Sequence, residues 1–127
     1  MANEHVLVIE DNEKNAKLAK DILEFRGYRV SVAGTAEDGL ARAAAEPPDL
    51  VLMDIQLPGM NGIEALAKLR EAEATKAIPV VAFTASVMPS DRHTIMAAGF
   101  NAFLSKPIAM KEFTETVAAQ IAARDAK

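Results

Sequence analysis

The segment DLVLMD, residues 49–54, decides the fold class of this 127-residue chain. Its four central residues are all apolar, which is typical of a strand that is covered on both faces. The segments VLVI at 6–9 and IPVVAF at 78–83 have the same form. Segment 28–33 alternates apolar and polar residues as a strand does, and segment 101–104 predicts a short fifth strand.

A helical pattern of apolar residues follows each expected strand. The first helix is expected to end at Gly27 and the fourth, over about residues 90–98, at Gly99. Thr35–Asp38 has the form of a capping box, and Asn61 with Glu64 is expected to cap the third helix. Apolar positions that indicate helices are Leu18, Ala19, Ile22, Leu23, Phe25, Leu40, Ala43, Ala44, Ile63, Leu66, Leu69, Phe113, Val117 and Ile121. Residues 123–127 are expected to fray.

Five strand–helix repeats predict one α/β domain, a doubly wound parallel sheet with helices on both faces. Right-handed crossovers restrict the possible topologies. A chain of 127 residues is long enough to bury a core without disulfides or metal.

Composition excludes several classes of function. The net charge is −4 without a Lys/Arg stripe, so we expect neither direct nucleic-acid binding nor membrane-surface binding. The absence of cysteine excludes disulfides and thiol chemistry. The first residues lack the pattern of a signal peptide, and no apolar run reaches the length of a membrane span. We therefore expect a cytoplasmic domain.

Polar residues follow four of the five expected strands. In a parallel sheet the carboxyl ends of the strands line one crevice, where ligands bind. The residues expected there are Glu10 and Asp11, Asp54, Thr84, and Ser105 with Lys106.

The three acids in this group indicate a cation site. Carboxylates within about 5 Å of each other repel by about 3 kcal/mol per pair at an effective dielectric of 20. Oxygen ligands without His or Cys suit Mg²⁺ or Mn²⁺. Lys106 adds a positive charge and Thr84 a hydroxyl, so the set suits phosphoryl transfer to Asp54. Each residue alone has an ordinary explanation, such as helix capping or a turn, but their joint placement at four strand ends favours function.

Four stretches resemble the receiver domain of two-component response regulators: VLVIEDN at 6–12, DLVLMDIQLPGMNG at 49–62, VVAFTA at 80–85 and FLSKPI at 103–108. They occur in the same order and span nearly the whole chain. The resemblance implies a flavodoxin-like sheet with strand order 2-1-3-4-5. It also implies a receiver domain over residues 1–127 with an ordered core at about 4–123, and a regulator rather than a metabolic enzyme.

The resemblance assigns the chemistry to Asp54, which would accept the phosphoryl group. Asp11, Asp54 and the backbone carbonyl of Gln56 would ligate Mg²⁺, and Glu10 would act through a metal-bound water. Lys106 would contact a phosphoryl oxygen, and its peptide bond to Pro107 would be cis.

The resemblance also implies a conformational switch. Thr84 and the backbone around Ala85 would close on the phosphoryl group, and Phe103 would respond to that movement. The family more often has Tyr at this position, so Phe103 lacks a hydroxyl, and we expect its ring to lie mostly inward before phosphorylation. Gln56 and Ser86 stand where the family tunes the lifetime of the acyl phosphate.

The expected partners are a histidine kinase or a histidine phosphotransfer protein, and a downstream protein. Because the given sequence leaves no room after the last helix for an output domain, we expect the output to be a surface of this domain. The resemblance implies the family's usual signalling face, which is the fourth helix, fifth strand and fifth helix, about Ser90 to Ala123. We also expect a monomer. A phosphorelay intermediate, a phosphate sink and a receiver domain from a hybrid kinase remain alternatives. An aspartyl phosphatase would need a second Asp where Gln56 stands.

The remaining notable residues are expected to be structural. His5 and His93 are interpreted as exposed bystanders. The six methionines are interpreted as gap-filling core and turn residues.

Overall fold

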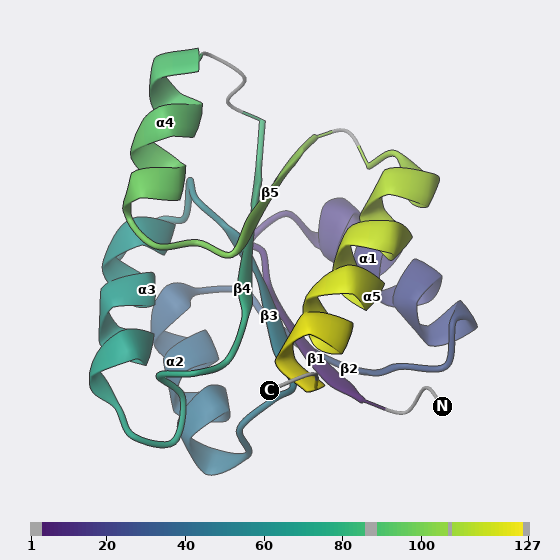
Figure 1. Ribbon diagram of the computed structural model, residues 1–127, viewed down its shortest axis with the longest axis horizontal. Coiled ribbons are helices and arrows are strands. Elements are labelled where there is room, and N and C mark those ends of the chain that lie inside the picture. The colour runs from purple at the N-terminus through teal and green to yellow at the C-terminus, as the bar shows by residue number, and fades with distance from the viewer. Residues whose placement is uncertain (1–3, 86–88, 107, 126–127) are drawn as a thin grey trace.

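The structure is a computed structural model that describes residues 4–85, 89–106 and 108–125. Strands and helices alternate along these residues (Figure 1). The strands are β1 (His5–Ile9), β2 (Arg29–Ala33), β3 (Leu50–Asp54), β4 (Val80–Thr84) and β5 (Ala102–Ser105). The helices are α1 (Glu13–Phe25), α2 (Ala36–Ala45), α3 (Gly62–Glu71), α4 (Pro89–Ala97) and α5 (Met110–Asp125). None of the helices in these ranges is long and apolar enough to cross a membrane.

All five strands form one parallel sheet in the order β2-β1-β3-β4-β5. This confirms the fold class and the strand order that the resemblance implied. The order changes direction between β1 and β3, so the chain after β1 runs to one side and the chain after β3 to the other. Such a switch point opens a crevice at the carboxyl ends of these strands.

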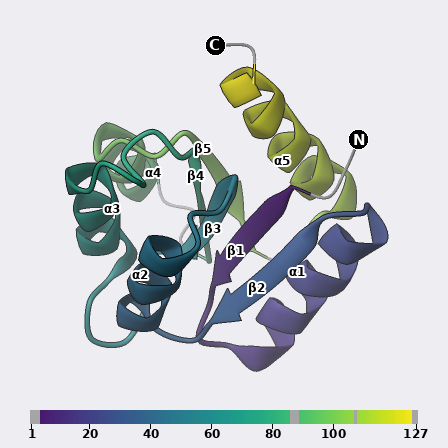
Figure 2. The same cartoon turned by 90° about the horizontal axis from the view of Figure 1, so that it is seen from below.

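Helices cover both faces of the sheet (Figure 2). Helices α2, α3 and α4 pack on a cluster that includes Leu7, Ile9, Val51 and Met53. Helices α1 and α5 pack on the opposite cluster, which includes Val6, Val8, Leu50 and Leu52. Neighbouring residues of one strand therefore belong to different cores, which explains why these strands are apolar without alternation.

Local signals set the helix ends as expected. Asn61 and Glu64 exchange side-chain-to-backbone hydrogen bonds in a complete capping box that starts α3. The Thr35 hydroxyl accepts from the backbone N–H of Asp38 at 3.1 Å and starts α2. Gly27 and Gly99 follow α1 and α4 with φ of 95° and 111°, a conformation that favours glycine. Helix α5 continues to Asp125, two residues beyond residue 123, where the chain was expected to begin to fray.

Two of the apolar residues that indicated α1 lie outside the core. Leu18 is 46% exposed and Phe25 is 89% exposed. They lie seven residues apart on one face of α1, roughly 100° around the helix from the face of Ala19, Ile22 and Leu23, which is buried. Apolar spacing indicated a helix correctly, but it could not show which of two apolar stripes faces the sheet.

His5 and the methionines also differ from expectation. The His5 side chain is buried at the start of β1, where Nε2 lies 2.7 Å from the hydroxyl of Ser31 on β2. His93 is exposed, as expected. Met53 is fully buried and Met60 packs against the core, but Met96 and Met110 are exposed. Met1 and Met88 lie outside the described residues.

Candidate functional site

The polar residues expected at the strand ends meet at the carboxyl edge of the sheet. Glu10 directly follows β1, Asp54 ends β3, and Thr84 ends β4. Thr84 pairs with Ser105 in the register of β4 and β5, and the Lys106 N–H donates to the Thr84 carbonyl at 2.9 Å. This hydrogen bond extends the pairing of β4 and β5 by one residue and holds the Lys106 backbone at the crevice.

Three carboxylates form the centre of the site. Glu10, Asp11 and Asp54 each place an oxygen within 4.8 Å of the others. Glu10 is 2% exposed and Asp54 is 3% exposed, whereas Asp11 is exposed to solvent. The spacing agrees with the expected acid cluster, and burial makes repulsion between the acids strong.

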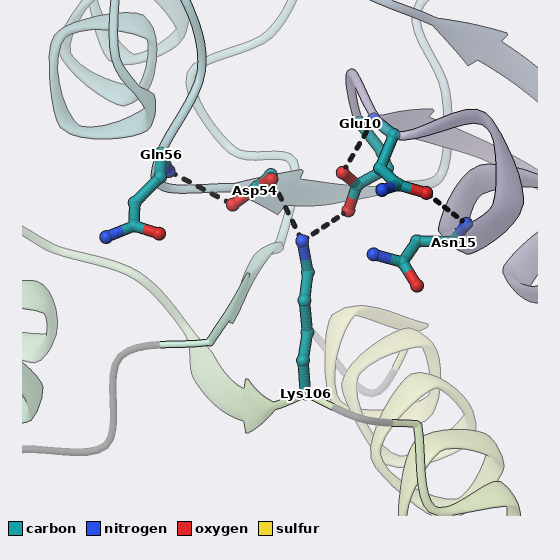
Figure 3. A network of polar contacts seen from close by, with 6 residues as sticks. Glu10, Asn15, Asp54, Gln56 and Lys106 are labelled. Atoms are coloured by element: carbon teal, nitrogen blue, oxygen red, sulfur yellow. Dashed lines mark hydrogen bonds and ion pairs between the residues drawn. The ribbon is translucent and has the colours of Figure 1, made fainter.

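Lys106 supplies a positive charge to this cluster. Its Nζ lies 2.8 Å from Oε1 of Glu10 and 3.0 Å from Oδ2 of Asp54 (Figure 3). The same ammonium lies 5.1 Å from the centre of the Phe83 ring, a cation–π distance. Lys106 was expected to add a positive charge here, and it bridges the two buried acids.

Backbone N–H groups orient the two buried carboxylates. The Asn12 N–H donates to Oε2 of Glu10 at 3.0 Å. The Gln56 N–H donates to Oδ1 of Asp54 at 3.0 Å (Figure 3). The Asn12 side chain in turn accepts from the Asn15 N–H and caps α1. Each acid is thus held by the loop that follows its own strand.

Burial controls the ionisation of Glu10 and Lys106. Desolvation raises the pKa of Glu10, with the charge of Asp54 acting in the same direction, and together they outweigh the bonds from Lys106 and Asn12. Burial alone would lower the pKa of Lys106, but its contacts with Glu10 and Asp54 raise it overall. Lys106 therefore stays a cation at neutral pH.

Gly62 lies at the site, although the sequence analysis named it only as the last residue of the stretch 49–62. A Cβ at this position would lie 2.6 Å from the Asp54 carbonyl oxygen. The Gly62 N–H also donates to the Ile55 carbonyl at 3.0 Å. The start of α3 is therefore pressed against the backbone of Asp54, and only glycine fits there. A glycine at the first position of a helix was the signal available in the sequence.

The residues of the expected switch lie on β4 and β5 or directly after β4. Thr84 is fully buried, and Ala85 after it is exposed. Phe103 is half-buried and packs against the core beneath α2, α3 and α4. The guanidinium of Arg92 on α4 lies 5.2 Å from the centre of the Phe103 ring. Ser86 and Pro107 lie outside the described residues, and with them the predicted cis peptide.

The donor set fits Mg²⁺. The clustered ligand atoms are carboxylate oxygens, which hard divalent cations prefer. Asp11 is exposed and keeps one side of the cluster open to water, as an ion that retains several water ligands requires.

Sequence comparison identifies the family. A family model described as "Response regulator receiver domain" matches residues 6–118. The chain belongs to this family. It is 41% identical over 112 residues to the polar-differentiation response regulator DivK of Brucella ovis, covering 88% of this chain and 91% of DivK. DivK of Brucella anthropi is 40% identical over 112 residues, which again cover 88% of this chain and 91% of that protein.

Solved receiver domains have the same fold. A CheY-like receiver domain of Methanospirillum hungatei superposes with a TM-score of 0.89 at 28% identity, covering 98% of both chains. The receiver domain of the sensor histidine kinase PA1611 of Pseudomonas aeruginosa superposes with a TM-score of 0.88 at 30% identity, covering 95% of this chain and 99% of that one. That structure has a magnesium ion coordinated in its active-site cleft.

These findings place the chain in two-component signalling. It is a receiver-domain response regulator rather than a metabolic enzyme, and its family implies a histidine kinase as a partner. The triad of Glu10, Asp11 and Asp54 is consistent with a magnesium site of the receiver type.

Proposed function

We propose that this receiver domain accepts a phosphoryl group on Asp54. The observation that carries the proposal is the setting of the Asp54 carboxylate: it is buried, one oxygen accepts from the Gln56 N–H, and the other contacts Lys106. A carboxylate fixed in this way presents its oxygen in one orientation, which favours attack on a phosphorus atom.

The reaction moves one phosphoryl group between two proteins. A carboxylate oxygen of Asp54 attacks the phosphorus of a phosphohistidine, the P–N bond breaks, and the imidazole leaves and takes up a proton. Asp11, Asp54 and the backbone carbonyl of Gln56 would hold Mg²⁺, with Glu10 acting through a water ligand. The ion would neutralise charge on the phosphoryl oxygens. Lys106 would neutralise the remaining charge on the phosphoryl group. The Thr84 hydroxyl, at the end of the neighbouring strand, would donate a hydrogen bond to it.

The output surface in this proposal comprises α4, β5 and α5. Phe103 supports it, because this residue lies on β5 two positions before Ser105, the register partner of Thr84. A movement of Thr84 toward the phosphoryl group changes the space beside β5, and Phe103 with Arg92 transmits the change to α4. A monomer in the cytoplasm would bind its downstream protein through this face.

Intact-mass spectrometry tests the acceptor. Incubation with acetyl phosphate and Mg²⁺ should add the mass of one phosphoryl group to the wild-type protein. The Asp54→Asn variant should gain none, because an amide oxygen is a poor nucleophile. Asp38→Asn, which changes an exposed acid of α2 that pairs with Arg42, is the matched control and should be labelled like the wild type. Labelling of Asp54→Asn to the wild-type extent would refute the assignment.

A further inference from the structure

A polar pocket lies at the amino ends of β4 and β5, whereas Asp54 lies at the carboxyl end of β3. It has a volume of about 530 Å³, within the range of small-molecule sites. The end of α3, the segments that lead into β4 and β5, and α5 line it. Its polar lining consists of Arg70, Lys76, Asn101 and Gln120.

Arg70 is the central cation of this pocket, and all its described partners are neutral. Its Nη1 donates to the carbonyls of Lys76 at 3.1 Å and Ile78 at 2.7 Å. Its Nη2 donates to Oδ1 of Asn101 at 2.9 Å. Within residues 4–85, 89–106 and 108–125, no ion pair includes Arg70.

The charge of Arg70 is thus half-buried without an acidic side chain to balance it. Burial lowers the pKa of Arg70, and no charged partner opposes that effect. Lys76 already has a carboxylate partner, since its Nζ lies 2.9 Å from Glu73. An anion in the pocket would supply the missing countercharge to Arg70.

The pocket retains unused hydrogen-bond donors. A guanidinium has five N–H groups, and the contacts above use both on Nη1 and one on Nη2. The Nε–H and the second Nη2–H have no bond among the described contacts. Oδ1 of Asn101 accepts from both Arg70 and the Val80 N–H at 2.9 Å, which leaves the amide nitrogen of Asn101 as a donor.

We propose that this pocket binds a small organic carboxylate. Its two oxygens match the planar arrangement of the guanidinium donors, as in paired Arg–carboxylate contacts. Pro79, Ala77 and Ala123, which also line the pocket, give a short carbon chain an apolar surface. The pocket shares no residue with the acid cluster around Asp54.

Sodium propionate is the probe, with sodium chloride at equal ionic strength as the reference. Amide chemical shifts of Gly99 and Asn101 should move with propionate and saturate with a Kd on the order of millimolar, as expected for so small a ligand. Arg70→Gln should weaken binding at least tenfold, by about 1.4 kcal/mol. Arg42→Gln, on the exposed face of α2, should leave the Kd unchanged.

The Asn101→Asp variant distinguishes a ligand-binding role of Arg70 from a structural role alone. The new carboxylate keeps the acceptor for Arg70 and Val80 and places a fixed anion beside the guanidinium. We expect this variant to melt at a higher temperature than the wild type and to lose the propionate response. This test remains valid even if Arg70→Gln does not fold. Equal shifts with propionate and chloride in the wild type would overturn the proposal, as would an undiminished response in Asn101→Asp.

Discussion

Lys106 keeps two buried carboxylates together in the metal-free protein. Its ammonium contacts both Glu10 and Asp54, so two of the three acids share one positive charge. Mg²⁺ would take its ligands from the same cluster of carboxylates. We therefore expect the ion and the ammonium to compete for the charge of Asp54. Removal of an acid and removal of the lysine should therefore change the stability of the metal-free protein in opposite directions.

Mg²⁺ should stabilise the wild-type fold. For a Kd of about 1 mM, 10 mM Mg²⁺ contributes about 1.4 kcal/mol, because the ion binds only the folded protein. This corresponds to about 3–6 °C in melting temperature. Asp11→Asn should abolish the response and stabilise the metal-free protein by relieving repulsion. A thermal denaturation series with Mg²⁺ measures both effects, and a full response in Asp11→Asn would contradict the assignment of Asp11 as a ligand.

Lys106→Met should destabilise the metal-free protein by about 3 kcal/mol, because it leaves buried acids without a countercharge. The same variant should gain more stability from Mg²⁺ than the wild type does, since no ammonium then competes for Asp54. Lys17→Met is the control, because its pair with Asp21 is exposed and its loss should leave the unfolding curve nearly unchanged. Urea denaturation with and without Mg²⁺ distinguishes the variants. A smaller Mg²⁺ effect in Lys106→Met would show that Lys106 assists the ion instead of competing with it.

Among the secondary-structure elements, α2 and β1 make a particularly close contact. Gly39 in α2 lies against Ile9, and a Cβ at residue 39 would come within 2.7 Å of Cγ1 of this fully buried side chain. A glycine inside a helix normally weakens it, so the sequence alone favours alanine there. The packing of α2 on β1 reverses that preference.

Gly39→Ala should therefore lower the melting temperature. Overpacking costs about 1–3 kcal/mol, which exceeds the gain of about 1 kcal/mol in helix propensity. Gly34→Ala is a matched control, because nothing lies within 4 Å of a Cβ at residue 34. The control should unfold within a degree or two of the wild type, roughly as other surface substitutions do. Stabilisation by Gly39→Ala would mean that Ile9 can move aside at no cost.

The whole molecule has two cores that share one sheet. Leu7 belongs to the cluster beneath α2, α3 and α4, and Leu52 to the cluster beneath α1 and α5. Their strands β1 and β3 are direct neighbours. Loss of packing on one face therefore also weakens the strands that support the other face. We expect both cores to unfold together.

Leu7→Ala and Leu52→Ala should each reduce the free energy of unfolding by about 2–5 kcal/mol. Leu18→Ala, on the exposed side of α1, should change it by less than about 1 kcal/mol. Hydrogen exchange measures whether the change reaches both faces: amides of α3 and α5 should lose protection together in either core variant. Protection that falls on one face only would show that the two cores unfold separately.

The sequence by itself determined the order of strands and helices and the edge where the acids meet. Apolar runs and helical spacing are local patterns. Parallel strands joined by helices then place the carboxyl ends of all the strands at the same end of the sheet. Glu10, Asp11, Asp54 and Lys106 could therefore be assigned to one site before their distances were known. The capping of α3 by Asn61 and Glu64 was equally predictable, because both partners lie within one helical turn.

Tertiary structure decided the environment of individual side chains. The burial of His5, the exposure of Leu18 and Phe25, and the bridge from Lys106 to two acids depend on how separate elements pack. The same holds for the pocket at Arg70, whose partner Asn101 is 31 residues away. Periodicity constrains a residue relative to its own helix or strand, whereas its neighbours in space come from segments far along the chain. Only the packed fold brings those segments together and fixes the charges and contacts between them.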